Sequence, residues 1–322
     1  MTDSSATQAL PAEGQRLPWT AIPARLRSAV EHELGGHVVA AATQPGGFSP
    51  GVAARLTLDS GERAFIKAVG DINPESPGIH RAEARIAAAL PARTPAPRLL
   101  GSIDSDGWVI LLFEDIDGHM PAMPWRPEEL QRVLAAMTDL AAALTPAPIE
   151  APSVAVRFTN LGTGWRNLAE SWPELAADLP AWAAQHLDEL VAMEAAWSEA
   201  VSGPSLVHAD IRADNILLTQ DRVVFVDWPW ACQAASWFDL VAMLPSVAMQ
   251  GGPEPESVLT GHLVTSGVDA DAITAVVTAL AGMFAWLGAQ PDPPGLPTLR
   301  AFQRAQADVA MSWLRQRTGW PI

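Results

Sequence analysis

Residues 206–228 read LVHADIRADNILLTQDRVVFVDW. The apolar runs ILL and VVFV lie on either side of TQDR, a polar segment typical of a turn, so we predict a β-hairpin. This hairpin would carry Asp227 at the end of its second strand, while His208, Asp210 and Asn215 lie just before its first strand. The sequence therefore predicts that two carboxylates and one amide meet at one place in the fold.

These residue types suit phosphoryl transfer, and the spacing H-x-D-x(4)-N is that of a kinase catalytic loop. Phosphoryl transfer depends on positioning and charge neutralisation more than on covalent chemistry. Asp210 can accept a hydrogen bond from an attacking hydroxyl group and orient it. Asp227 and the Asn215 carbonyl offer the hard oxygens that Mg²⁺ prefers, so we predict a magnesium site formed by these two residues. We predict that His208 is a buried structural histidine rather than a base.

Lys67 is the only lysine in the chain, and the other 19 of the 20 basic residues are arginine. In such a chain, a retained lysine suggests a position that needs a compact ammonium group. We predict that Lys67 is catalytic and contacts the α- and β-phosphates of a nucleotide. Glu83 falls on the apolar face of a helix predicted over residues 79–90, where it needs a partner such as Lys67. The alternatives are a surface lysine and a pair between Glu83 and Arg81.

A glycine-rich stretch, QPGGFSPG, precedes the strand that leads to Lys67. The backbone N–H groups of such a loop can approach phosphates closely. We predict five short strands in this part of the chain, with a flexible hinge after the last one. The predicted nucleotide-binding residues of the loop are Gly46, Gly47, Ser49 and Gly51. The predicted strands are 37–43, 52–59, 63–69, 98–103 and 108–113, and the hinge is 114–118.

The hydrophobic pattern changes after the hinge, where helical patterns dominate, for example over residues 127–144 and 184–201. We therefore predict an α+β fold with two lobes. Residues 1–118 would form a β-rich nucleotide-binding lobe, with residues 1–18 as a loose tail. Residues 119–322 would form a larger, α-rich catalytic and substrate lobe.

The formal net charge of −16 argues against nucleic-acid binding, which relies on Lys and Arg to neutralise phosphates. Residues 119–322 carry 22 of the 36 acidic residues, so this part of the chain could attract a cationic substrate, although solubility is the simpler explanation because a summed charge does not locate a site. The single cysteine, Cys232, excludes an internal disulfide and favours a reducing, cytoplasmic compartment. The N-terminus shows no secretion signal. The uncharged stretch 272–291 lacks basic anchors, so we predict a buried helix rather than a membrane span.

The chain resembles the aminoglycoside phosphotransferase family of protein-kinase-like small-molecule kinases over most of residues 37–245. HADIRADNILL resembles the family's H-G-D-x-x-x-x-N loop, VDW resembles its metal-binding step, and ASWFDL resembles the element that follows. Ala209 stands where the family usually has glycine, and Pro229 stands where an acid is common. The resemblance implies a bilobal kinase fold that binds ATP (or GTP) with Mg²⁺.

The same resemblance implies that the base contacts the hinge backbone near Glu114 and Ile116, and that Asp239 braces the catalytic loop. A helix N-cap is the alternative role for Asp239. The function we expect is transfer of the γ-phosphate to a hydroxyl of a small molecule, with a cationic amino sugar or antibiotic as one option. The motifs leave the acceptor, the choice between ATP and GTP, and the oligomeric state open.

Two other functions are considered. A protein kinase would carry Arg at the position of Ala209 and a longer segment after Asp227 that ends in A-P-E, and neither is present. A catalytically inactive nucleotide-binding scaffold would be expected to have lost one or more catalytic residues, and all are retained. For the acceptor pocket, the candidates are tryptophans, which can face a cation, and acids, which can bind amines. The alternatives are packing in the core or on the surface for each tryptophan and a solvated loop for the acids. The candidates are Trp165, Trp230, Trp237, Glu254, Glu256, Asp269 and Asp271.

Overall fold

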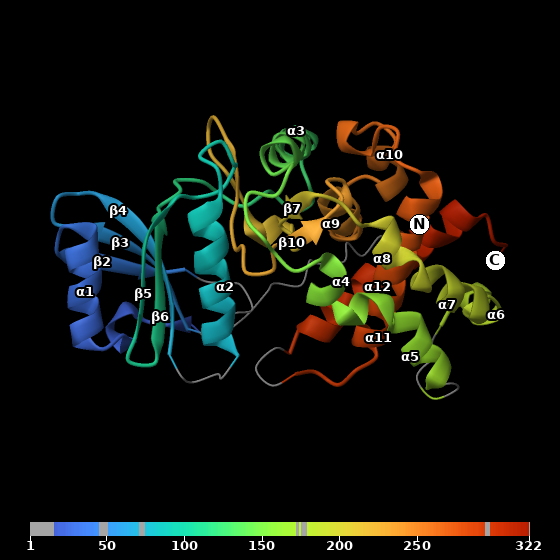
Figure 1. The fold of residues 1–322 in the computed structure, drawn as a ribbon, viewed down its shortest axis with the longest axis horizontal. Helices are drawn as coiled ribbons and strands as arrows, with labels where there is room; N and C mark the ends of the chain where they lie inside the picture. Colours follow the sequence, from blue (N-terminus) through green and yellow to red (C-terminus); the bar gives the residue numbers. More distant parts are fainter. Residues whose placement is uncertain are drawn as a thin grey trace, which may run out of the picture.

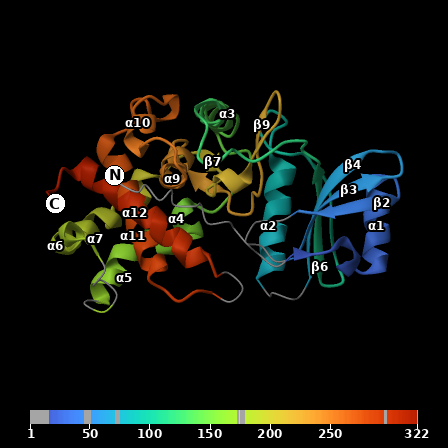
Figure 2. The same ribbon diagram turned by 180° about the vertical axis from the view of Figure 1, so that it is seen from behind.

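The structure is a computed structural model that describes residues 16–44, 51–70, 75–171, 174, 179–293 and 297–321. A β-sheet with its helices forms one end of the molecule, and a larger helical lobe forms the other (Figure 1; Figure 2). The α+β, bilobal fold class predicted from the sequence is therefore confirmed.

The small lobe is built on a six-stranded sheet with the order β1-β3-β4-β6-β5, in which β2 also pairs with β3. All pairs are antiparallel except β1 with β3, which is parallel. Within the described residues, two α-helices and one 3-10 helix belong to this lobe. The strands are β1 (Arg16–Leu17), β2 (Val38–Thr43), β3 (Gly51–Leu58), β4 (Arg63–Val69), β5 (Leu99–Ser105) and β6 (Trp108–Glu114), and the helices are η1 (Trp19–Ala21), α1 (Ala24–Leu34) and α2 (Ser76–Ala89).

The two faces of this sheet are covered by different helices. On one face, Val52 and Leu56 of β3 pack into a core with Leu26 of α1. Side chains alternate along a strand, so Ala53 of β3 lies on the opposite face, beside its register partner Lys67 of β4. On that opposite face, here called the α2 face, the sheet packs against α2, which lies between the sheet and the large lobe in both views (Figure 1; Figure 2).

The large lobe is mainly helical, with two short antiparallel strand pairs, β7 with β10 and β8 with β9. The predicted hairpin that carries Asp227 is confirmed as β8 and β9. The helices are α3 (Pro127–Ala143), α4 (Val154–Arg157), η2 (Thr159–Gly162), α5 (Gly164–Glu170), α6 (Ala181–Gln185), α7 (Leu187–Ala195), α8 (Trp197–Ala200), η3 (Ala213–Asn215), α9 (Phe238–Met249), α10 (Pro255–Leu259), η4 (Leu263–Thr265), α11 (Ala270–Gly288) and α12 (Leu299–Thr318). The strands are β7 (Ser205–Val207), β8 (Ile216–Leu218), β9 (Val223–Phe225) and β10 (Cys232–Ala234).

Two predictions about the chain's path are wrong. Residues 16–18 do not belong to a loose tail, because Arg16 and Leu17 form β1 and pair with β3. The apolar residues that follow, Trp19 and Ile22, are buried in the small-lobe core and hold this segment in place. The single helix predicted over 184–201 is divided into the end of α6, α7 and α8. The predicted loop residues Gly46, Gly47 and Ser49 lie outside the residues that the structure describes.

α11 is long and apolar enough, by length and composition alone, to cross a membrane. It packs against α12 and α5 inside the large lobe, and more than half of it is buried there. Gly282 lies where α11 meets α5, and a Cβ atom at this position would come within 2.5 Å of the Trp165 ring. The helix that the sequence analysis predicts from the uncharged stretch is therefore a core helix of the large lobe, and its glycine permits a close helix crossing.

Candidate active site

The catalytic loop follows β7, and Asp239 at the start of α9 holds it in place. One carboxylate oxygen of Asp239 accepts the backbone N–H of His208 at 2.8 Å, and the other accepts that of Ala209 at 2.7 Å. Ala209 has a φ of 65°, which lies in the left-handed region that favours glycine. This explains why glycine suits the position, and the two hydrogen bonds explain how alanine is held there. The residue at the N-cap of α9 is Trp237, so Asp239 does not cap this helix.

His208 is a structural residue, as predicted. Its Nε2 donates to the carbonyl oxygen of Val226 at 2.9 Å, and its Nδ1 accepts the backbone N–H of Asp210 at 3.2 Å. Burial lowers the pKa of His208 to about 4, so the ring is neutral near pH 7. The ring therefore joins the catalytic loop to the strand that leads to Asp227.

Asp210 is surrounded by polar groups of its own loop. Its Oδ1 accepts from Nη1 of Arg212 at 2.7 Å, and its Oδ2 accepts from Nδ2 of Asn215 at 3.2 Å. Burial raises the pKa of Asp210 to about 7, although the positive charge of Arg212 acts in the opposite direction. A carboxylate with such a pKa can accept a proton near neutral pH, as a catalytic base must.

Arg212 is a residue that the sequence analysis did not single out. Its guanidinium binds Asp214 through Nε at 3.0 Å and Nη2 at 2.8 Å, in addition to its bond to Asp210. The planar fork of arginine permits this double contact. The signal in the sequence was an arginine placed between two aspartates in DIRAD, a pattern that is also common on solvated surfaces.

Lys67 connects the small lobe to the hairpin of the large lobe. Its Nζ lies 2.8 and 2.7 Å from the two carboxylate oxygens of Glu83 and 2.5 Å from Oδ1 of Asp227. The predicted pair of Lys67 and Glu83 is therefore present, and Arg81 binds Asp104 instead. Glu83 also accepts the backbone N–H of Trp228 at 3.3 Å. The contacts bring β4, α2 and the end of the hairpin to one point.

Opposite charges explain why Lys67, Glu83 and Asp227 can share a partly buried site. Burial lowers the pKa of Lys67, but the charges of Asp227 and Glu83 outweigh burial and raise it above the usual value. Burial likewise acts to raise the pKa of Asp227, but Lys67 outweighs it and lowers that pKa. Asp227 has a φ of 71°, a conformation that Asp adopts more readily than most residues. Lys67 is thus a cation and Asp227 an anion near neutral pH.

The donor set of the predicted metal site suits magnesium. Asn215 donates its amide N–H to the carbonyl oxygen of Asp210 at 2.8 Å, so its own side-chain oxygen is the atom left for a cation. Among the residues that the structure describes, no group of three or more His, Cys, Asp or Glu side chains could hold a metal ion alone. Asn215 and Asp227 therefore fit a Mg²⁺ ion that also takes ligands from a bound nucleotide.

Residues 55–272 match the model of the Phosphotransferase enzyme family. The chain belongs to this family. The match includes Lys67, Glu83, the catalytic loop and Asp227, and it ends in α11. A search of the curated proteins gives no match.

Several solved structures share the fold. A choline/ethanolamine kinase family protein from Mesorhizobium loti has a TM-score of 0.57 and 18% identity, over 91% of this chain and 94% of that one. An aminoglycoside phosphotransferase from Alicyclobacillus acidocaldarius has a TM-score of 0.54 and 16% identity, over 83% and 89%. A thermostable mutant of aminoglycoside phosphotransferase APH(4)-Ia, with ADP and hygromycin B, has a TM-score of 0.56 and 14% identity, over 91% and 97%. These likenesses place the phosphotransferase in a protein-kinase-like fold.

The hinge of this phosphotransferase carries contacts that the sequence analysis missed. The carbonyl oxygen of Ile116 accepts from Nη2 of Arg55 at 2.9 Å and from the backbone N–H of Gly118 at 3.0 Å. The Asp115 carboxylate lies between Arg55 and Arg63, 3.3 and 3.1 Å from their Nε atoms. If the base of a bound nucleotide used the Ile116 carbonyl oxygen, it would therefore have to displace Arg55. The side chain of Glu114, also predicted at the base site, binds Arg222 at 2.6 Å.

Most acceptor-pocket candidates have structural roles. Trp165 and Trp237 are buried in the large-lobe core, so they are not pocket walls. Trp230 is half-buried, and its ring centroid lies 6.1 Å from that of Phe158. Glu256 binds the guanidinium of Arg317 at 2.7 Å. The acids Asp269 and Asp271 lie at the start of α11, where Asp269 caps the helix.

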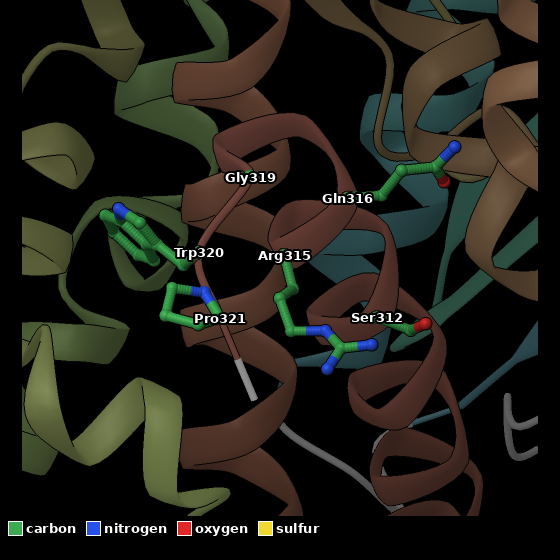
Figure 3. Close-up of a pocket in the computed structure, with 6 residues that line it drawn as sticks. All are labelled: Ser312, Arg315, Gln316, Gly319, Trp320 and Pro321. Atoms are coloured by element: carbon green, nitrogen blue, oxygen red, sulfur yellow. The ribbon is translucent and has the colours of Figure 1, made fainter.

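A pocket of about 500 Å³ lies at the C-terminal end of α12 (Figure 3). It includes none of the predicted catalytic residues, and Figure 1 places this end of the chain at the opposite end of the molecule from the sheet. Trp320 at its rim stacks on His186, with ring centroids 4.1 Å apart. The pocket is therefore separate from the predicted catalytic residues. It is lined by Ser312, Arg315, Gln316, Gly319, Trp320 and Pro321.

Proposed function

We propose that the protein transfers the γ-phosphate of ATP or GTP to a hydroxyl group of a small molecule. The observation that carries this proposal is the convergence of Lys67, Glu83 and Asp227 from two lobes, next to a loop that presents Asp210 and Asn215. A structural ion pair alone does not explain a second, partly buried acid with a pKa near 7.

In the proposed reaction, the acceptor hydroxyl attacks the γ-phosphorus. A new P–O bond forms as the bond to the β-phosphate oxygen breaks, and the nucleoside diphosphate leaves. Asp210 orients the hydroxyl group and takes its proton. Lys67 places its ammonium against the α- and β-phosphates, and Glu83 keeps that ammonium in position.

Asn215 and Asp227 would hold the magnesium ion, which neutralises charge on the phosphates when it is bound. Arg212 keeps Asp210 in one rotamer and opposes its protonation. The part of the chain up to residue 118 would serve as the nucleotide-binding lobe, with ATP or GTP beneath the loop that ends at Gly51.

Similar structures support the ligand classes in this proposal. The APH(4)-Ia mutant structure contains ADP and hygromycin B, and the amicoumacin kinase hAmiN is in complex with AMP-PNP, Ca²⁺ and Ami. These ligands belong to those proteins. For this chain, a small-molecule acceptor agrees with the short segment between Asp227 and α9, which leaves little room for a peptide platform.

The experiment that tests the proposal is an acceptor screen with Mg·ATP and Mg·GTP, read by the mass increase of one phosphoryl group. The panel should contain amino sugars, choline-like alcohols and neutral sugars. Asp210→Asn should lower kcat by roughly 10²–10⁴ without loss of nucleotide binding. Nucleotide binding without transfer to any acceptor would favour a scaffold, and near-normal turnover by Asp210→Asn would refute the role of Asp210.

A further inference from the structure

β1 is firmly anchored although it contains only two residues. Leu17 packs against the small-lobe core, and Trp19 and Ile22, which follow it, are buried in that core. The pairing of β1 with β3 is parallel, with Arg16 opposite Gly51 and Leu17 opposite Val52. These contacts determine which way the neighbouring side chain, that of Arg16, must point.

The register places Arg16 on the α2 face of the sheet. Leu17 and its partner Val52 point to the α1 core, so Arg16 and its partner Gly51 belong to the opposite face. Ala53 lies on that same face, two residues along β3, and its partner across the sheet is Lys67. Arg16 therefore lies on the face that carries the catalytic ammonium.

Gly51 makes this position suitable for a ligand. It ends the glycine-rich stretch and has a φ of 113°, a conformation that favours glycine. A Cβ atom at Gly51 would come within 2.5 Å of the carbonyl oxygen of Ala68, so the backbone of β3 approaches β4 closely here. Arg16 thus lies next to the part of the loop where phosphates are expected.

The surrounding charges agree with this placement. Burial lowers the pKa of the half-buried Arg16, and the opposing charge is that of Asp227, the proposed metal ligand. Arg16 also contributes to the lowered pKa of His80, which lies one turn before Glu83 on α2. The Arg16 guanidinium is therefore close enough to interact electrostatically with Asp227 and His80, which lie where the phosphates are expected.

A nucleoside triphosphate would bring several negative charges to this face of the sheet, where the carboxylates of Glu83 and Asp227 already bind the Lys67 ammonium. We propose that Arg16 binds a β- or γ-phosphate oxygen of the nucleotide, as a second cation supplied by the N-terminal strand. This inference rests on the proposed function, because it assumes that a nucleoside triphosphate occupies the site.

The test is a comparison of Arg16→Met, Arg16→Lys and wild type by titration with a nucleoside and its mono-, di- and triphosphate, in the presence of Mg²⁺. Both purine series are titrated, and the one that binds wild type more tightly is used. Arg16→Met should weaken triphosphate binding roughly 10- to 100-fold, the effect of a lost hydrogen bond to a charged group. Nucleoside binding should stay within about twofold of wild type, since no phosphate is involved.

Arg25→Met is the matched control, because Arg25 is an exposed arginine on α1, which covers the other face of the sheet. It should leave all four affinities unchanged. A loss of affinity by Arg16→Met that is equal for nucleoside and triphosphate would show a purely structural role and overturn the inference, as would no loss at all. If Arg16→Met does not fold, Arg16→Lys is judged by the same ratio of triphosphate to nucleoside affinity. Failure of wild type to bind any nucleotide would instead refute the proposed function.

Discussion

Removal of the Lys67 ammonium should expose the energetic cost of the buried charges around it. In Lys67→Met, the carboxylate of Glu83, only 3% exposed, and that of Asp227 lose a cation that contacts both. Removal of one partner from a buried ion pair typically costs about 3–5 kcal/mol, so we expect a loss of this size at pH 8. The loss should be smaller at pH 5. Burial already raises the pKa of Glu83, and a carboxyl with a raised pKa destabilises the fold progressively as the pH rises through that value.

The assay is urea unfolding followed by tryptophan fluorescence, because the chain contains 13 tryptophans, with circular dichroism as a second probe. Coincident transitions are needed before a free energy of unfolding is calculated for a protein of two lobes. The double variant Lys67→Met/Glu83→Gln completes a thermodynamic cycle and should show a coupling energy of about 0.5–3 kcal/mol. It should be more stable than the additive expectation, since the neutral amide needs no cation.

The variant Lys67→Arg tests whether the site needs only a positive charge at this position or also the compact shape of the ammonium group. Three contacts of 2.5–2.8 Å converge on a single nitrogen in the wild type, and the longer planar guanidinium cannot reproduce that geometry. We expect this variant to fold but to lose most of its activity. The reasoning would be refuted by a Lys67→Met protein as stable as wild type at pH 8, or by a Lys67→Arg enzyme with normal turnover.

Three further predictions concern the loop and the core. Asp239→Asn should cost about 1–3 kcal/mol of unfolding free energy and lower kcat, because the amide cannot accept both backbone N–H groups of the catalytic loop; an unchanged urea midpoint would contradict this. kcat/KM should rise with pH through about 7, since Asp210 must lose its proton to act, and a midpoint near pH 4 would show that its pKa is not raised. Gly282→Ala should cost about 1–3 kcal/mol by overpacking against the buried Trp165 ring, whereas Gly78→Ala, where a Cβ meets nothing within 4 Å, should not reduce the melting temperature.

The sequence by itself was sufficient to predict the catalytic loop and the hairpin that follows it. His208, Asp210, Asn215 and Asp227 lie within 20 residues of one another, and turn residues between two apolar runs determine how such a short segment folds. The roles of His208 as a structural residue and of Glu83 as the partner of Lys67 were also predictable. A buried polar group needs a partner, and few candidates were present nearby.

The tertiary structure alone decided which distant residues meet. Lys67 and Asp227 are 160 positions apart, and nothing in their local sequences states how the two lobes close on each other. The bond from Arg55 to the hinge carbonyl and the placement of Arg16 beside Gly51 depend on strand register in the same way. Trp165 and Trp237 were predicted as possible pocket walls, but both are buried in the core. Their burial depends on how the whole lobe packs, and the local sequence does not show it. Local patterns encode turns and amphipathic faces, whereas long-range pairing is determined by how those faces pack together.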